Sequence, residues 1–101
     1  MSMGWANYYI DDLLNGKTVK FRPKGNSMVP RIYSGQLCTV EPVPSELNVN
    51  DVVLCRVKGN QYLHLITAIR NNQYQISNNK GHVNVWVTRN AIFGKLIRIE
   101  D

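Results

Sequence analysis

Apolar residues recur with two different periods along this chain of 101 residues. Between residues 5 and 14, Trp5, Tyr9 and Leu13 are spaced four apart, as on one face of an α-helix, and Asn15-Gly16 supplies a stop signal. From Lys17 onward, apolar and polar residues alternate in short runs, which is the period of half-buried β-strands. The pattern therefore predicts a short N-terminal helix followed by a mainly β domain.

The predicted strands are short runs separated by turn signals. They cover residues 17–22, 36–41, 51–58, 61–70, 74–78, 82–87 and 92–99, with a short or helical turn at 88–91. Gly59-Asn60 and Asn71-Asn72 are typical of two-residue hairpin turns. We expect a helical segment at 1–16 and one β domain at 17–101.

The hairpin turns predict which residues stand opposite each other on neighbouring strands. Counting back from Gly59-Asn60 places Cys55 opposite His64, and counting from Asn71-Asn72 places Asn79 opposite His64. Opposite residues share one face of a sheet, with Cβ atoms ~5 Å apart. On this register, His64 lies on a middle strand between Cys55 and Asn79.

The net charge of +5 raises the question of an anionic partner. The basic residues before Gly25 are Lys17, Lys20, Arg22 and Lys24. They alternate with Val19 and Phe21, which is more typical of the solvent face of a strand, and no known nucleic-acid-binding motif is present. Nucleic-acid binding is therefore the less favoured interpretation.

Cys38 and Cys55 are too few for a disulfide framework, and both lie in apolar strand patterns, so we expect buried free thiols. With His64 and His82 they lack the short paired spacings of zinc sites, and we expect neither a metal nor a cofactor. Cys55 beside His64 is the arrangement that can activate a thiolate, but an apolar strand argues against it. His82 is interpreted as a strand-edge residue.

The location of the protein is predicted from what the chain lacks. No apolar run approaches the ~18 residues that a membrane-spanning helix needs, and no signal-peptide pattern opens the chain. We therefore expect a cytoplasmic protein without a transmembrane anchor.

The candidate chemistry lies in residues 25–30, Gly25-Asn26-Ser27-Met28-Val29-Pro30. Gly25 permits backbone conformations that other residues avoid, and Pro30 stiffens the chain after the serine. This combination can hold the Ser27 hydroxyl on a rigid corner. Local chemistry alone still favours a plain turn between two strands.

Gly25-x-Ser27-Met28-x-Pro30, with residues 33–37 after it, resembles the nucleophile box of the S24/S26 serine peptidases. This family contains the LexA-type self-cleaving repressors and the type I signal peptidases. Further blocks match in the same order at 50–54, 62–66 and 92–97, so that the resemblance runs from residue 17 to residue 99. It implies a coiled, partly open β-barrel.

The resemblance also implies roles for individual residues. Ser27 would be the nucleophile and His64 the general base, as in the endoplasmic-reticulum-type signal peptidases, with Asn79 or Asn78 orienting the imidazole. Gly25, Asn26, Met28 and Pro30 would form the substrate pocket and the oxyanion loop. The chain departs from the family where those enzymes carry an acidic third residue, because here it has Ser77-Asn78-Asn79-Lys80.

Three functions follow from these observations. The first is a serine endopeptidase that cleaves a peptide or protein substrate, and the second is a non-catalytic peptide- or protein-binding module with the same fold. A nucleic-acid-associated accessory protein is the third and weakest. The helical segment is too short for a helix-turn-helix and has no Ala-Gly or Cys-Gly scissile pair, so self-cleavage is not expected. A homodimer, or a partner that supplies the missing acid, remains open.

Overall fold

The computed structural model of the chain describes residues 6–25, 28–78 and 85–101. The fold is mainly β, as predicted, with one short helix and a sheet of seven strands. The elements are α1 (Asn7–Leu14), β1 (Val19–Phe21), β2 (Leu37–Pro42), β3 (Val52–Val57), β4 (Asn60–Arg70), β5 (Gln73–Ser77), β6 (Val85–Thr88), the 3-10 turn η1 (Arg89–Ala91) and β7 (Ile92–Glu100). This helix is not long and apolar enough to cross a membrane, and no other helix within the described ranges is.

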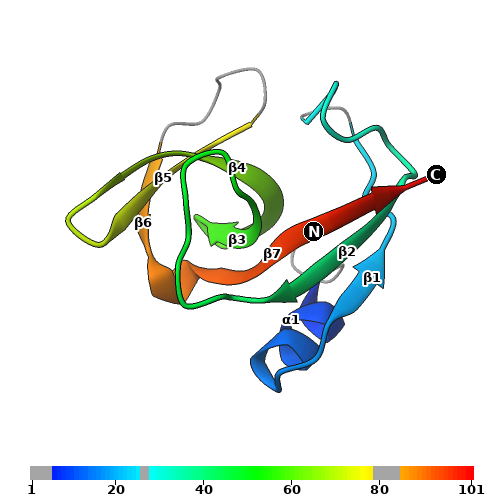
Figure 1. The fold of residues 1–101 in the computed structure, drawn as a ribbon, viewed down its shortest axis with the longest axis horizontal. Helices are drawn as coiled ribbons and strands as arrows, with labels where there is room; N and C mark the ends of the chain where they lie inside the picture. Colours follow the sequence, from blue (N-terminus) through cyan, green and yellow to red (C-terminus); the bar gives the residue numbers. More distant parts are fainter. Residues whose placement is uncertain (1–5, 26–27, 79–84) are drawn as a thin grey trace.

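The sheet has the strand order β1-β2-β7-β3-β4-β5-β6, and all its pairings are antiparallel. β7 joins the two halves, because it pairs with β2 on one side and with β3 on the other. In Figure 1, β1, β2 and β7 run side by side, while β3, β4 and β5 curl away from them. Register shifts in the β2–β7, β3–β7 and β4–β5 pairs mark irregularities of the kind that bends a sheet. The result is a half-barrel.

The predicted helix forms and ends where expected, although Trp5 lies outside the described residues. Asn15 is its C-cap, and Gly16 follows with φ +83, a conformation that glycine adopts without strain. Ile10 and Leu13 are buried on one face, so α1 covers an end of the half-barrel beside β1 (Figure 1). The division of the chain at residue 16 into two segments stays a prediction.

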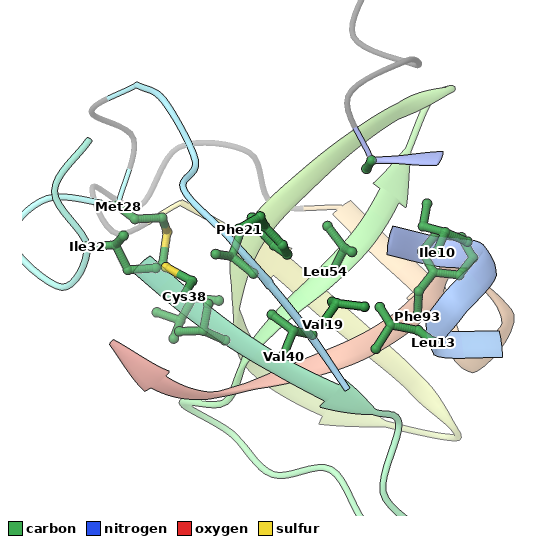
Figure 2. Close-up of a cluster of buried hydrophobic side chains, with 14 residues drawn as sticks. Ile10, Leu13, Val19, Phe21, Met28, Ile32, Cys38, Val40, Leu54 and Phe93 are labelled. Atoms are coloured by element: carbon green, nitrogen blue, oxygen red, sulfur yellow. The ribbon is translucent and has the colours of Figure 1, made fainter. Parts of the chain in front are cut away.

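The core consists of two hydrophobic clusters on opposite sides of β3. Val52 and Leu54 of β3 belong to the first cluster, whereas Val53 and Cys55 belong to the second, which explains the unbroken apolar run of this strand. Figure 2 shows the first cluster, which extends from Ile10, Leu13 and Phe93 at one end to Met28, Ile32 and Cys38 at the other. Cys38 and Cys55 are both buried free thiols, as predicted.

The first hairpin turn is offset from its predicted place. Lys58 and Gly59 occupy the turn, with φ +52 and +83, so Val57 rather than Lys58 closes the ladder, opposite Asn60. The pairing therefore moves by two residues. Cys55 stands opposite Tyr62, and His64 stands opposite Val53. The predicted Cys55–His64 pair is wrong.

The second turn lies at Asn71-Asn72, as predicted, and Arg70 pairs with Gln73. A bulge between Ile66 and Ala68 then shifts the register, so that Leu65 stands opposite Ser77. The count from this turn assumed an unbroken ladder, so the register that it gave is wrong beyond the bulge. Asn79 itself lies outside the described residues, as does His82.

Candidate active site

The serine box lies on a loop, the segment 22–36, between the end of β1 and the start of β2. Both sides of this loop are tied together at its base. The Gly35 amide donates to the Pro23 carbonyl at 2.9 Å, and Arg22 Nη1 donates to the Gly35 carbonyl at 2.7 Å. Further along, the Gly25 amide donates to Ser34 Oγ at 3.2 Å. The backbone is thus fixed up to the residue before Asn26.

The far side of the same loop is anchored by apolar burial. Met28 and Ile32 are 5% and 4% exposed, and the Ile32 amide donates to the Met28 carbonyl at 3.0 Å. Both side chains lie at the end of the first cluster beyond Phe21 (Figure 2). Pro30 is exposed and does not line the pocket described next. Asn26 and Ser27 lie outside the described residues. Gly25 and Met28 are therefore the described residues that flank them in the chain.

A pocket of about 660 Å³ lies beside this loop. Its wall is built from α1, β1, the serine loop and β4. The lining residues are Tyr9, Phe21, Arg22, Pro23, Lys24, Gly25, Met28, Ile32, Tyr33, Ser34, Gln61, Tyr62, Leu63 and His64. The pocket therefore brings Gly25 and Met28, which bracket Ser27 in the chain, to the same cavity as His64.

His64 is buried on β4, with 3% of its surface exposed. Its ring stacks on that of Tyr62, two residues earlier on the same face of the strand, with centroids 4.6 Å apart and planes 13° from parallel. Burial removes water from the imidazole and lowers the pKa of His64 to about 4. The side chain is therefore neutral near pH 7 and can accept a proton.

The Cys55 thiol does not readily form a thiolate. Cys55 is fully buried, and its Sγ lies 3.6 Å from the Tyr62 carbonyl, to which it donates. Burial raises the pKa of Cys55 to about 12, although a backbone hydrogen bond with His64 acts in the opposite direction. A thiolate–histidine pair is thus disfavoured, as the apolar strand pattern indicated.

A lysine could serve as the base in place of His64, but Lys58 and Lys95 lie away from the pocket, and Lys80 lies outside the described residues. Lys95 Nζ is 3.5 Å from Asp51 Oδ1, and Lys58 occupies the exposed hairpin turn. Neither lines the pocket, whereas Lys24 does so as an exposed residue. Among the described residues, no group of three or more His, Cys, Asp or Glu side chains could hold a metal ion.

Several lining residues have no signal of function in the sequence. Tyr9 belongs to the apolar stripe of the predicted helix, and Phe21 alternates with lysines as any strand core residue would. Their rings pack together with centroids 4.8 Å apart. Arg22 and Lys24 belong to the predicted solvent face and are exposed, and both also line the pocket. These residues come together because α1, β1 and β4 line one pocket with the serine loop.

Comparison with known protein families gives a match. A family model described as Peptidase S24-like matches residues 7–97, a stretch that includes α1, the serine loop and β4. No match was found among the curated proteins.

Proposed function

The chain belongs to the Peptidase S24-like family, and on that premise we propose that it is a serine endopeptidase acting through Ser27 and His64. One observation carries the proposal. Gly25 and Met28, on either side of Asn26 and Ser27 in the sequence, line the same pocket as His64. Because consecutive Cα atoms are about 3.8 Å apart, the position of Met28 supports the proposal that the residue before it acts at this pocket.

In the proposed reaction, neutral His64 takes the proton of Ser27 Oγ as this oxygen attacks the carbonyl carbon of a peptide bond. Backbone N–H groups of the serine loop stabilise the negative charge that develops on the carbonyl oxygen. The imidazolium then protonates the amine leaving group, and an acyl-enzyme remains. Water attacks the ester, with His64 again as the base, and Ser27 recovers its proton.

The low pKa of His64 predicts slow turnover. A general base works best when its pKa is near the working pH, and His64 with a pKa of about 4 is a weaker base than an ordinary histidine. In related peptidases with histidine, an acidic residue would stabilise the imidazolium. Here the proposed orienting group is the neutral amide of Asn78, which the bulged register favours over Asn79.

The substrate would lie extended across the pocket. Residues 61–64 of β4 line the pocket, and we propose that an extended peptide pairs with this segment as an added strand. Gly25, Asn26 and Met28 are proposed as the substrate and oxyanion loop, and Pro30, which does not line the pocket, as the residue that stiffens it. The volume of about 660 Å³ falls in the range of small-ligand sites and exceeds what a single small side chain needs.

The second candidate function is a binding module that grips a peptide without cleaving it. It is favoured by one specific observation: the described lining of the pocket contains no aspartate or glutamate to support His64. The pocket itself is formed in either case. The two candidates therefore differ in chemistry and not in ligand.

Incubation with a mixture of unstructured decapeptides, followed by mass spectrometry, tests the proposal. Wild-type protein should cut a subset of the peptides, whereas Ser27→Ala and His64→Ala should cut none. Lys20→Ala, which changes an exposed residue of β1, should retain the wild-type pattern. Cleavage that survives in Ser27→Ala would contradict the proposed nucleophile, and binding without any cleavage would support the second candidate.

A further inference from the structure

The pocket lining combines buried apolar side chains, here called the apolar floor, with exposed cationic ones, here called the cationic rim. The apolar floor consists of Phe21, Met28, Ile32 and Leu63, which are 5%, 5%, 4% and 6% exposed. The charged lining side chains within the described residues, apart from neutral His64, are Arg22 and Lys24, and both are exposed. A ligand that fills the pocket can thus contact both apolar surface and positive charge.

Arg22 is held in a defined position. Its Nη1 donates to the Gly35 carbonyl at 2.7 Å, which uses one of the five N–H donors of the guanidinium. A planar guanidinium can bind both oxygens of a carboxylate at once, whereas Lys24 supplies a flexible point charge two residues away. Lys17 and Lys20, although close in sequence, do not line the pocket. Arg22 and Lys24 therefore differ from Lys17 and Lys20 in their position at the pocket and not in their charge.

We infer that the pocket selects peptides in which an acidic side chain lies next to an apolar one. The apolar side chain would enter the pocket over Phe21 and Leu63, and the carboxylate would contact Arg22 and Lys24 at the rim. This inference rests on the proposed function, since it assigns the pocket to a peptide. It goes further by naming the substrate chemistry and the two residues that determine it.

The expected preference is modest because both cations are exposed. Exposed ion pairs contribute little, so each cation should tighten binding of a carboxylate about 1.5- to 5-fold, and the two together about two- to 25-fold. Salt should weaken this preference, since the Debye length falls from ~8 Å at physiological ionic strength to ~3 Å at 1 M. The contribution of the apolar floor should not weaken in the same way.

Fluorescence anisotropy with three labelled decapeptides tests the inference. The peptides contain alanine, leucine and serine, carry an uncharged fluorophore, and differ only in a central residue: Asp, Asn or Lys. Full-length Ser27→Ala protein is used so that no peptide is consumed. The Asp peptide should bind about two- to 25-fold more tightly than the Asn peptide, and the Lys peptide should bind most weakly.

Variants then locate the preference. Lys24→Gln and Arg22→Gln should each reduce the Asp/Asn ratio about 1.5- to 5-fold, and Arg22→Lys should retain part of it. Lys20→Gln is the matched control, because it removes the same charge outside the pocket and should leave the ratio unchanged. Lys24 is the safer test, since Arg22 also holds Gly35.

The outcomes separate this inference from the proposed function. Equal affinity for the Asp and Asn peptides overturns the inference, as does an equal effect of Lys20→Gln and Lys24→Gln. The inference is also overturned if a single-stranded oligonucleotide binds more tightly than the Asp peptide and displaces that peptide from the same site. A clear Asp preference with no cleavage by wild-type protein sustains the inference and overturns only the catalytic proposal.

Discussion

Acidification should destabilise this protein through His64. The imidazole has a pKa of about 4 in the folded chain, whereas an unfolded chain gives its histidines the usual value near ~6.5. Between these values the unfolded state binds more protons, so the free energy of unfolding falls as the pH is lowered. The contribution of His64 is complete above about pH 6.5 and is lost by the time the pH falls through about 4.

The size of this effect follows from the shift. Each pKa unit is worth about 1.4 kcal/mol, so a shift from ~6.5 to about 4 corresponds to at most about 3 kcal/mol. That is a large share of the roughly 5–15 kcal/mol that typically separates folded from unfolded domains. Relaxation around a charged imidazole would reduce the loss, so about 3 kcal/mol is an upper bound.

Urea unfolding at pH 4, 5, 6 and 7 provides the assay, with His64→Gln as the control. Glutamine cannot titrate, so the variant keeps the acid dependence that comes from the carboxylates and loses the part that comes from His64. The wild-type free energy of unfolding should fall by up to about 3 kcal/mol more than that of the variant over this range. If both proteins lose the same stability, the imidazole does not titrate as a buried neutral group, and the reasoning is refuted.

Three further predictions concern activity, packing and the thiols. The kcat/KM of the wild-type protein should rise through an ionisation near pH 4 and be level by about pH 6, and Lys95→Met should keep that profile; a rising limb above pH 7 would instead indicate a lysine base. Gly94→Ala should lower stability by about 1–3 kcal/mol in thermal melts, because the added Cβ would lie 2.6 Å from the Glu41 carbonyl oxygen; an unchanged melting temperature would contradict that packing. Cys55, with a pKa of about 12, should not react with Ellman's reagent until the protein is unfolded, and rapid reaction of the native protein would contradict its burial.

Local sequence signals predict much of this fold because they act over few residues. The spacing of Tyr9 and Leu13 predicts α1, and Asn71-Asn72 correctly predicts the turn between β4 and β5. The first hairpin shows the limit of this approach. Lys58 takes up a left-handed conformation that its residue type does not favour, so the turn begins one residue before the expected glycine and the register moves by two.

The candidate site depends on contacts that sequence patterns do not contain. The bulge between Ile66 and Ala68 changes the residue expected opposite His64, and no glycine marks it. The low pKa of His64 arises because segments distant in sequence exclude water from β4. In the same way, Arg22 and Lys20 are both exposed cations, but Arg22, on the serine loop, lines the pocket and Lys20 does not. The motif identifies which residues to examine, and the packing determines what surrounds them.

The central claim is that Ser27 is a nucleophile activated by His64. Treatment with a serine-directed phosphonate, followed by intact-mass analysis, measures this directly and needs no knowledge of the natural substrate. Wild-type protein should gain the mass of one adduct, which maps to the peptide containing Ser27. Ser27→Ala should gain none, and His64→Ala should react far more slowly. An unmodified wild-type protein, or an equal adduct on Ser27→Ala, would contradict the claim.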